Sequence, residues 1–260
     1  MLGGACIINV AIGREYPRGQ DRLEASLSKF GAPSARLYWR NRLPPGSPSH
    51  QRVPYAFKPY AFRFAQRAGY ELVLWLDAAL TAIKPLGPIF ARIESEGYFF
   101  PLNGAWITGQ WCSDLALAKF GKTRAEAMQY PHIMACCLGL NLAHPLGRAF
   151  LDAWQEKADD GASFPGPWDN KNGAASSDPR VLGHRHDQTA ASFVAYDLGM
   201  RHWDDNIVEY YNKQNPHPDA FFVTGLPFRW WQYRFAAQRR QLAMRFARSG
   251  GEAEPSSGPP

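Results

Sequence analysis

Apolar stretches of strand length alternate with stretches of helical periodicity, and this alternation constrains the fold of the chain more than any other feature. The apolar runs span Ala5 to Ala11, Glu71 to Leu76 and Met134 to Asn141. Continuous apolar runs of this length are typical of strands buried on both faces. The alternation therefore predicts an α/β fold, with one domain built on a mostly parallel central sheet that carries helices on both faces.

Helices are predicted between and after these runs, and two further strands are predicted, over residues 36–39 and, as a short strand, over residues 97–100. The helical ranges are 21–30, 57–68, 86–96, 145–157 and 186–198, with shorter helices that begin after Ser113 and Thr123. Thr123 and Glu126 have the spacing of a capping box. Residues 159–183 are rich in Gly, Pro, Ser and Asp and show no periodicity. They predict a long loop, and long loops inside compact domains are usually lids or binding loops.

The net charge of +6 is concentrated near the C-terminus of the 260 residues. Residues 229–248 contain six arginines and no acidic residue, so the remainder of the chain is close to neutral. This distribution argues against a nucleic-acid-binding protein. We expect a domain over residues 1–248 that ends in a basic helix at 229–248, followed by a disordered tail at 249–260. Such a helix either docks on the protein surface or makes a peripheral contact with an anionic membrane.

The apolar runs and the cysteines bear on localisation. No apolar run is long enough to span a membrane, and the N-terminal run lacks the basic region of a secretory signal. The four cysteines include the adjacent pair Cys136 and Cys137, which is poorly suited to a structural disulfide. We therefore expect reduced thiols and a cytoplasmic protein, with the inner membrane face as the place of any peripheral contact.

Asp77 is the first candidate site residue, because it directly follows the apolar run that ends at Leu76. Ligands of open α/β sheets bind at the carboxyl ends of the strands. A carboxylate at this position can hold a Mg²⁺ or Mn²⁺ ion that bridges a diphosphate. The alternative is an aspartate that only begins a turn.

A second candidate site follows the long loop, in the sequence Gly183-His-Arg-His-Asp-Gln188. His184 and His186 are candidate metal ligands, and Asp187 is a candidate to act on a hydroxyl group. The start of a helix also favours anions through its free N–H groups and its dipole. The alternative is that Asp187 only caps the helix.

Lys58 is the third candidate, with Arg63 and Arg67 on the following turns of the same predicted helix. A basic group here would face phosphate groups. The alternative is a solvated helix face, which we favour for Arg67.

Together these segments resemble the GT-A type glycosyltransferases, the nucleotide-diphospho-sugar transferase superfamily. Ala5 to Arg22 resembles the beginning of that domain, and Tyr55-Ala-Phe-Lys-Pro-Tyr60 with Ala68 to Asp77 resembles the stretch that leads into its D-x-D motif. Cys136 to Asn141 resembles the acceptor-side strand, and His186-Asp-Gln188 is similar to a later Asp-Gln element. The chain departs from the family at Ala79, where the second acid of the D-x-D motif is expected.

The resemblance implies a hexosyltransferase-like enzyme of polysaccharide biosynthesis. Ala11 and Tyr16 would hold the nucleoside of a nucleotide-diphospho-sugar donor, and Lys58 and Asp77 would hold its diphosphate with manganese or magnesium. Asp187 would be the general base, and Gln188 would face the sugar or the acceptor. The metal ligands implied are Asp77, His184 and His186, and His184, His186 or Asp187 could replace the acid lost at Ala79. The acceptor is a glycan, a lipid-linked molecule or a protein.

Two rival functions remain open at the level of sequence. The first is a non-catalytic relative that binds a nucleotide sugar or a glycan, which Ala79 supports. The second is a metal-dependent hydrolase that uses the cluster at residues 184–187, which requires additional ligands nearby in space.

Overall fold

The structure analysed is a computed structural model that describes residues 4–33, 35–203, 206–210 and 214–225. The chain divides into two units, residues 1–224 and 225–260, and the description that follows concerns the first. The predicted basic helix at 229–248 and the predicted tail at 249–260 lie outside the described residues.

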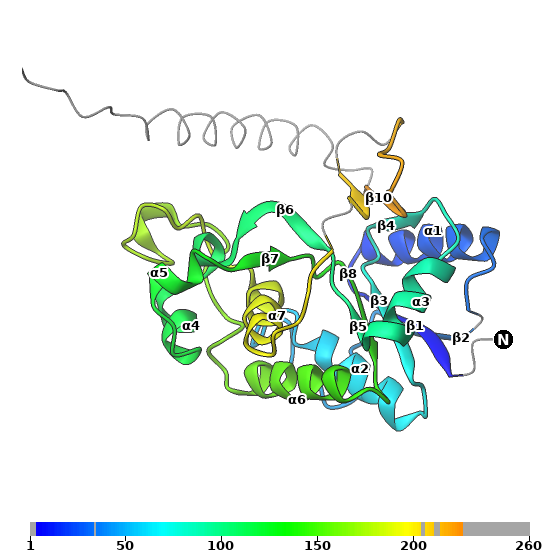
Figure 1. Ribbon diagram of the computed structural model, residues 1–260, viewed down its shortest axis with the longest axis horizontal. Helices are drawn as coiled ribbons and strands as arrows, with labels where there is room; N and C mark the ends of the chain where they lie inside the picture. The colour runs from blue at the N-terminus through cyan, green and yellow to red at the C-terminus, as the bar shows by residue number, and fades with distance from the viewer. Residues whose placement is uncertain (1–3, 34, 204–205, 211–213, 226–260) are drawn as a thin grey trace, which may run out of the picture. The chain divides into compact units, whose positions relative to one another are not determined.

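The central element of the first unit is a five-stranded sheet, whose strand order is β2-β1-β3-β8-β5 (Figure 1). Neighbouring strands β1, β2 and β3 are parallel, whereas β8 is antiparallel to both β3 and β5. All strands of this sheet except β8 therefore point the same way, which confirms the mostly parallel sheet. The strand bounds are β1 Ala5–Ala11, β2 Ala35–Arg40, β3 Leu72–Leu76, β5 Tyr98–Phe99 and β8 Cys137–Asn141.

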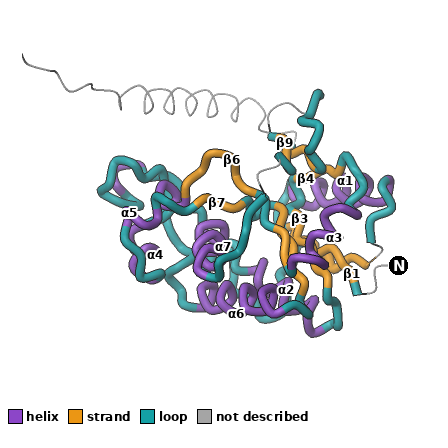
Figure 2. The backbone as a smooth tube through the Cα atoms, in the orientation of Figure 1, coloured by secondary structure: helices purple, strands orange, loops and turns teal. Residues whose placement is uncertain are grey.

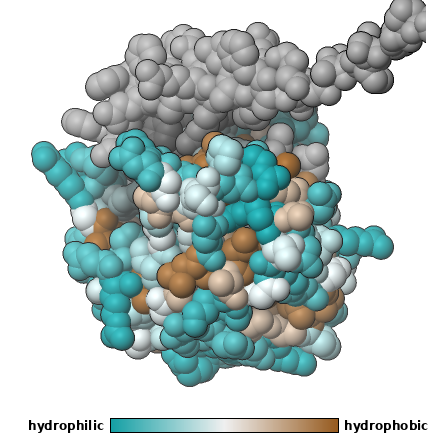
Figure 3. All heavy atoms as spheres, turned by 90° about the vertical axis from the view of Figure 1, so that its left-hand side faces the viewer, coloured by the Kyte–Doolittle hydropathy of each residue, from teal (hydrophilic) through white to brown (hydrophobic). Residues whose placement is uncertain are grey.

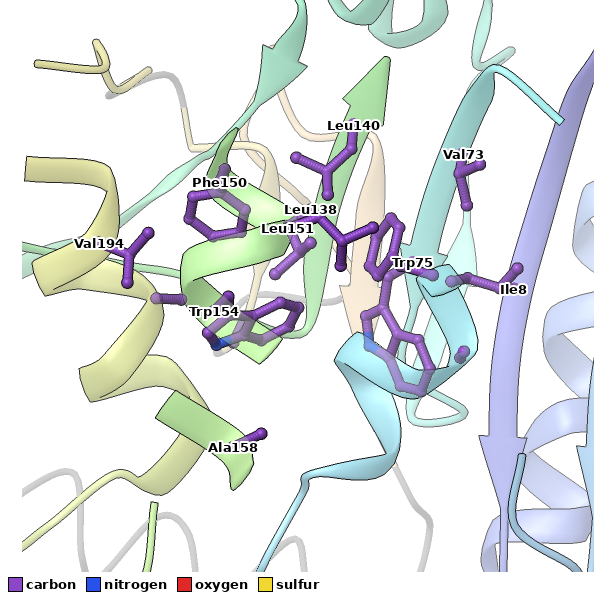
Figure 4. Packing of buried hydrophobic residues seen from close by; sticks show 14 of the residues in the cluster. Ile8, Val73, Trp75, Leu138, Leu140, Phe150, Leu151, Trp154, Ala158 and Val194 are labelled. Carbon is purple, nitrogen blue, oxygen red and sulfur yellow. The ribbon is translucent and has the colours of Figure 1, made fainter. Parts of the chain in front are cut away.

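Helices cover both faces of this sheet, as the sequence predicts (Figure 1). On one face, Leu23 and Phe90 pack against Ile7 and Leu74 of the sheet. On the other face, the core includes side chains from the sheet and from two helices that pack against each other (Figure 4). The helices are α1 Tyr16–Lys29 and α3 Gly87–Glu96 on the first face, and α2 Phe57–Arg67 and α6 Pro145–Asp159 on the second.

A second group of elements lies beside the sheet and packs on α6 through α7, His186–Asp197 (Figure 2). A two-stranded antiparallel ribbon packs against α7. The short helices α4 and α5 begin at Ser113 and Thr123 caps, and the predicted capping box of Thr123 and Glu126 is confirmed. The remaining bounds are β6 Leu102–Ile107, β7 Pro131–Ile133, α4 Asp114–Lys119 and α5 Arg124–Ala127.

Several elements differ from the sequence prediction. Helix α1 begins at Tyr16, five residues earlier than predicted, because Pro17 occupies its first turn, where proline needs no N–H partner. The ribbon strands β6 and β7 were not predicted, nor was a small sheet in which β10 joins β4 and β9. These small-sheet strands are too short to show a period: β4 Leu80–Ala82, β9 Val208–Glu209 and β10 Phe222–Thr224.

The face of the molecule on the side of α4 and α5 is mostly polar, with apolar residues gathered in small patches (Figure 3). Within the described part of the chain, no helix is both long enough and apolar enough to cross a membrane.

Candidate functional site

The centre of the candidate site is the Lys58 ammonium, which is buried on the core-facing side of α2. Lys58 lies on the same helical stripe as Phe62 and Ala65, which pack into the core, and its side chain is only 3% exposed. Its Nζ donates to the carbonyl oxygen of Ala135 at 2.7 Å. The alternative of a solvated helix face is therefore wrong for Lys58, whereas Arg67 is exposed as expected.

Two carboxylates flank this ammonium. Lys58 Nζ lies 2.8 Å from Asp187 Oδ2 and 3.4 Å from Asp77 Oδ1. Burial alone lowers the pKa of Lys58, but Asp187 and Asp77 outweigh burial and raise it well above its usual value. The ammonium is therefore permanently charged. The structure thus confirms that positions 77 and 187 lie together, although their catalytic and binding roles stay predictions.

Asp77 directly follows β3 and is the most accessible of the three side chains, with 34% of its surface exposed. Its backbone N–H donates to the Cys136 carbonyl at 2.8 Å, and its carbonyl accepts from Leu80 N–H at 3.0 Å. The Trp75 indole N–H donates to Asp77 Oδ1 at 2.6 Å. Backbone and side chain are thus both held, and the carboxylate is fixed at the carboxyl end of the strand.

Asp187 lies in the first turn of α7, and its side chain is 5% exposed. Burial raises the pKa of this carboxyl to about 6, although Lys58 acts in the opposite direction. The Trp154 indole N–H donates to the Asp187 carbonyl at 3.1 Å, which anchors the turn to α6. Arg185, not Asp187, is the residue that precedes the helix, and no side chain caps it. The capping alternative for Asp187 is therefore wrong.

Two residues beside the ammonium adopt the left-handed backbone conformation that side chains rarely take. The φ angles are +62° at Tyr55 and +48° at His186, and their ring centroids lie 5.5 Å apart. Such a conformation costs on the order of 1–3 kcal/mol per residue and is concentrated at functional sites. The Tyr55 ring lies 5.5 Å from Lys58 Nζ. Burial, followed by the charge on Asp187, raises the pKa of Tyr55, so its hydroxyl remains a hydrogen-bond donor.

The two histidines predicted as metal ligands hold the loop before α7. His184 Nδ1 lies 3.3 Å from the Ser113 backbone N–H and accepts from it, so Nε2 carries the proton and donates to the Phe164 carbonyl at 2.9 Å. His186 Nδ1 contacts the same carbonyl at 2.9 Å. Both nitrogens of His184 are therefore used within the fold, which leaves it no lone pair for a metal.

The predicted nucleoside residues Ala11 and Tyr16 lie at the end of β1 and the beginning of α1. Ala11 is buried, and its carbonyl accepts from the Asn41 N–H at 2.8 Å. Tyr16 is 47% exposed. Its hydroxyl contributes to the raised pKa of Tyr55, so the two phenols are near neighbours.

Gln188 is one residue beyond Asp187 on α7. Its carbonyl accepts from the Ser192 hydroxyl at 2.7 Å. Its side-chain Nε2 is buried and has no hydrogen-bond partner among the described residues. An amide left in this state can donate to a ligand.

A buried amide pair, which was not among the predicted site residues, ties the carboxyl ends of β1 and β3 together. Asn9 is completely buried, its Nδ2 donates to the Leu76 carbonyl at 2.5 Å, and its Oδ1 accepts from Gln20 Nε2 at 2.7 Å. The available signal was one polar residue inside the apolar run of residues 5–11. Tyr55 and Trp75 were also missed, because aromatic residues in such segments are usually assigned to the core.

Among the described residues, Asp77 is the candidate ligand that fits a divalent cation best, because its carboxylate is the accessible one. The described residues contain no group of three or more His, Cys, Asp or Glu side chains that could hold a metal ion. Asp77 Oδ1 faces Trp75 and Lys58, so its other oxygen is the one free to bind a cation. Magnesium-like cations are often held by one carboxylate together with substrate phosphates. The residues therefore fit a cation that arrives with a diphosphate.

Comparison with known proteins gives only distant similarity. No protein-family model matches the chain, and no curated protein matches its sequence. Similar solved structures include a glycosyltransferase involved in the glycosylation of the major capsid of PBCV-1, with 15% identity and a TM-score of 0.48 over 85% of this chain and 93% of that chain. Mouse xyloside xylosyltransferase 1, in its apo form, has 10% identity and a TM-score of 0.49 over 85% and 97% of the two chains.

The WbbM bifunctional glycosyltransferase, also in its apo form, has 9% identity and a TM-score of 0.49 over 86% of this chain and 46% of that chain. Similarity at this level assigns neither a family nor an activity to the chain.

Proposed function

We propose that the chain is a glycosyltransferase that takes a sugar from a nucleotide-diphospho-sugar and transfers it to an acceptor hydroxyl group. The observation that carries this proposal is the buried Lys58 ammonium, held by Asp77 and Asp187. Asp77 lies at the carboxyl end of a parallel strand, where ligands of α/β sheets bind. The order of these segments, which resembles that of GT-A type enzymes, supports the same function.

The donor diphosphate would bind at the third N–H of Lys58. The Ala135 carbonyl and the Asp187 carboxylate lie 2.7 and 2.8 Å from Lys58 Nζ, whereas the contact to Asp77 is 3.4 Å long. Asp77 is also the exposed partner, so a phosphate oxygen arriving from solvent competes with the weakest contact. Tyr16, half-exposed at the beginning of α1, would lie against the nucleoside beside Ala11.

Local charge supports a divalent cation on Asp77. At pH 7, Lys58, Asp77 and Asp187 carry one positive and two negative charges, because the pKa of Asp187 is about 6. A diphosphate added to this net negative charge requires further positive charge nearby. A bound Mn²⁺ or Mg²⁺ would supply that charge and stabilise the departing diphosphate as a Lewis acid.

The chain's own residues would divide the transfer between them. Lys58 would stabilise negative charge on the leaving diphosphate, which is usually a large contribution in such reactions. Asp187 would accept the proton of the acceptor hydroxyl, and a pKa of about 6 places it near the range suited to a general base. The Nε2 of Gln188, which no described residue contacts by a hydrogen bond, would donate to a sugar hydroxyl.

One observation favours a second candidate function, a protein that binds a nucleotide sugar or a glycan without turnover. Asp187 is almost completely buried and paired with Lys58, which is also the arrangement of a purely structural ion pair.

The test is incubation of the purified chain with uridine and guanosine diphosphate sugars, Mn²⁺ and a panel of glycan acceptors. Release of nucleoside diphosphate that depends on acceptor, and is lost in Lys58→Met, is the expected result. Binding of a nucleotide sugar without any release supports the second candidate. If the chain neither binds a nucleotide sugar nor releases nucleoside diphosphate, both candidate functions are contradicted.

A further inference from the structure

Trp168 is the most conspicuous exposed aromatic residue near the candidate site. It lies in the loop of residues 159–183, and 50% of its surface is exposed. Its ring centroid lies 5.7 Å from that of His186, which in turn lies 5.5 Å from that of Tyr55. The ring of Tyr55 is 5.5 Å from Lys58 Nζ. A row of rings thus leads outward from the ammonium to Trp168.

The indole of Trp168 is braced from behind by a buried guanidinium. The Arg185 guanidinium lies 3.9 Å from the ring centroid of Trp168 and 3.9 Å from that of Trp111, so it is stacked between the two. Arg185 is 3% exposed, and its Nη1 donates to the Trp168 carbonyl at 2.5 Å. One face of the indole is therefore covered by Arg185, while half of the residue's surface remains exposed.

The backbone around Trp168 is equally constrained. Gly183 has a φ of +153°, and a Cβ atom placed there would lie 2.0 Å from the Trp168 carbonyl oxygen. The Asn170 N–H donates to the Leu182 carbonyl at 3.1 Å, which closes the base of the loop. A large exposed ring that is held in one orientation loses little entropy when it binds a ligand.

We propose that Trp168 is the platform on which a sugar ring of the acceptor stacks. The electron-rich face of an indole attracts the weakly positive C–H groups on the apolar face of a pyranose. Hydroxyl groups around the pyranose rim require polar partners, and the adjacent Asp169 and Lys171 carry charged groups on the surface. Along the row of rings, Trp168 lies farther from Lys58 than Tyr55 does. We therefore assign the acceptor sugar, and not the donor sugar, to Trp168.

This proposal rests on the proposed function, and the experiment separates the two. Saturation-transfer NMR measures binding of a panel of glycans to the chain saturated with nucleoside diphosphate and Mg²⁺. The panel contains methyl glycosides of common hexoses and xylose, together with maltose and cellobiose. Trp168→Leu retains apolar packing on Arg185 but lacks the aromatic face, whereas Trp168→Tyr retains one. Leu115→Ala, at an exposed residue of α4, is the control.

Trp168→Leu is expected to weaken glycan binding about tenfold or more, Trp168→Tyr to retain most of it, and Leu115→Ala to leave it unchanged. The thermal shift given by nucleoside diphosphate should be the same in all variants. If wild type shows no such shift, the proposed function fails, whatever the role of Trp168. Equal glycan binding by wild type and Trp168→Leu would overturn the platform. The platform would also be overturned if no glycan of the panel binds to nucleotide-loaded wild type.

Discussion

The Lys58 ammonium and the Asp187 carboxylate form an ion pair at 2.8 Å in which both side chains are at least 95% buried. The two residues come from different helices, α2 and α7, so the pair joins the sheet-covering layer to the neighbouring group of elements. Buried pairs of this kind contribute little net stability when intact but are costly to break, because the remaining charge is left without a partner.

Lys58→Met is therefore expected to lower the free energy of unfolding by about 3–5 kcal/mol. The change retains the apolar stem and leaves Asp187 buried without its cation. Urea denaturation at pH 7 measures the effect. Adding Asp187→Asn to this variant should recover part of the loss, since the unpaired charge is then removed.

Lys122→Met provides the control, because Lys122 forms a 2.6 Å pair with a partly exposed Asp197. Removing this pair should cost no more than about 1 kcal/mol. Equal losses for Lys58→Met and Lys122→Met would show that the buried pair has no special energetic role.

Asp187→Asn tests the proposed general base. We expect turnover to fall by on the order of a hundredfold or more, while nucleoside diphosphate binding persists, because Lys58 keeps its contacts with Ala135 and Asp77. Single-turnover kinetics with saturating donor separates binding from chemistry. Full activity in this variant would remove Asp187 from the reaction.

Trp75→Phe tests whether Asp77 must be held away from Lys58. The substitution retains an aromatic ring but removes the N–H that donates to Asp77 Oδ1 at 2.6 Å. The freed carboxylate should close on the third N–H of Lys58 and compete with phosphate, so affinity for nucleoside diphosphate should fall. Calorimetric titration measures this affinity. Trp39→Phe, at a buried position on β2, is the control, and equal affinities in the two variants would contradict this role.

The lowered pKa of the buried His132 side chain should make the free energy of unfolding depend on pH. It is completely buried, and burial lowers its pKa to about 3, with Arg185 acting in the same direction. The folded state therefore binds fewer protons than the unfolded state between pH 3 and about 6.5. The contribution of neutral His132 to the free energy of unfolding is complete above about pH 6.5. It is lost as pH falls, at a slope of about 1.4 kcal/mol per pH unit. Urea denaturation from pH 7 to pH 5 should show a smaller decline in His132→Asn, and an unchanged slope would contradict this assignment.

The sequence predicts strands β1, β3 and β8 of the central sheet well, because these strands are almost completely buried and therefore appear as continuous apolar runs. Strand β1 matches its prediction at both ends, Ala5 and Ala11. The strands β4, β7, β9 and β10 were missed, since strands of two or three residues show no period and form only against partners that are distant in sequence. Strand β6 is six residues long, but Asn103 and Gly104 interrupt its apolar pattern.

Within the site, residue type and position predicted Asp77 and Asp187 but not the means by which they meet. The two carboxylates come together because Lys58 is buried between them. The position of Lys58 on the same helical stripe as Phe62 and Ala65 could have indicated this burial. The use of both His184 nitrogens by Ser113 and Phe164 could not be predicted, because those partners belong to backbone groups of other segments.

The central claim is that a nucleoside diphosphate binds at Lys58 and Asp77 with a divalent cation. Its most direct test is the thermal shift of wild type and Asp77→Asn with uridine or guanosine diphosphate, each with and without Mn²⁺. Binding to the native state raises the melting temperature. Nucleotide and Mn²⁺ together should stabilise wild type more than either does alone, and Asp77→Asn should lose this synergy. Equal shifts in the two proteins would contradict the claim, as would the absence of any shift in wild type.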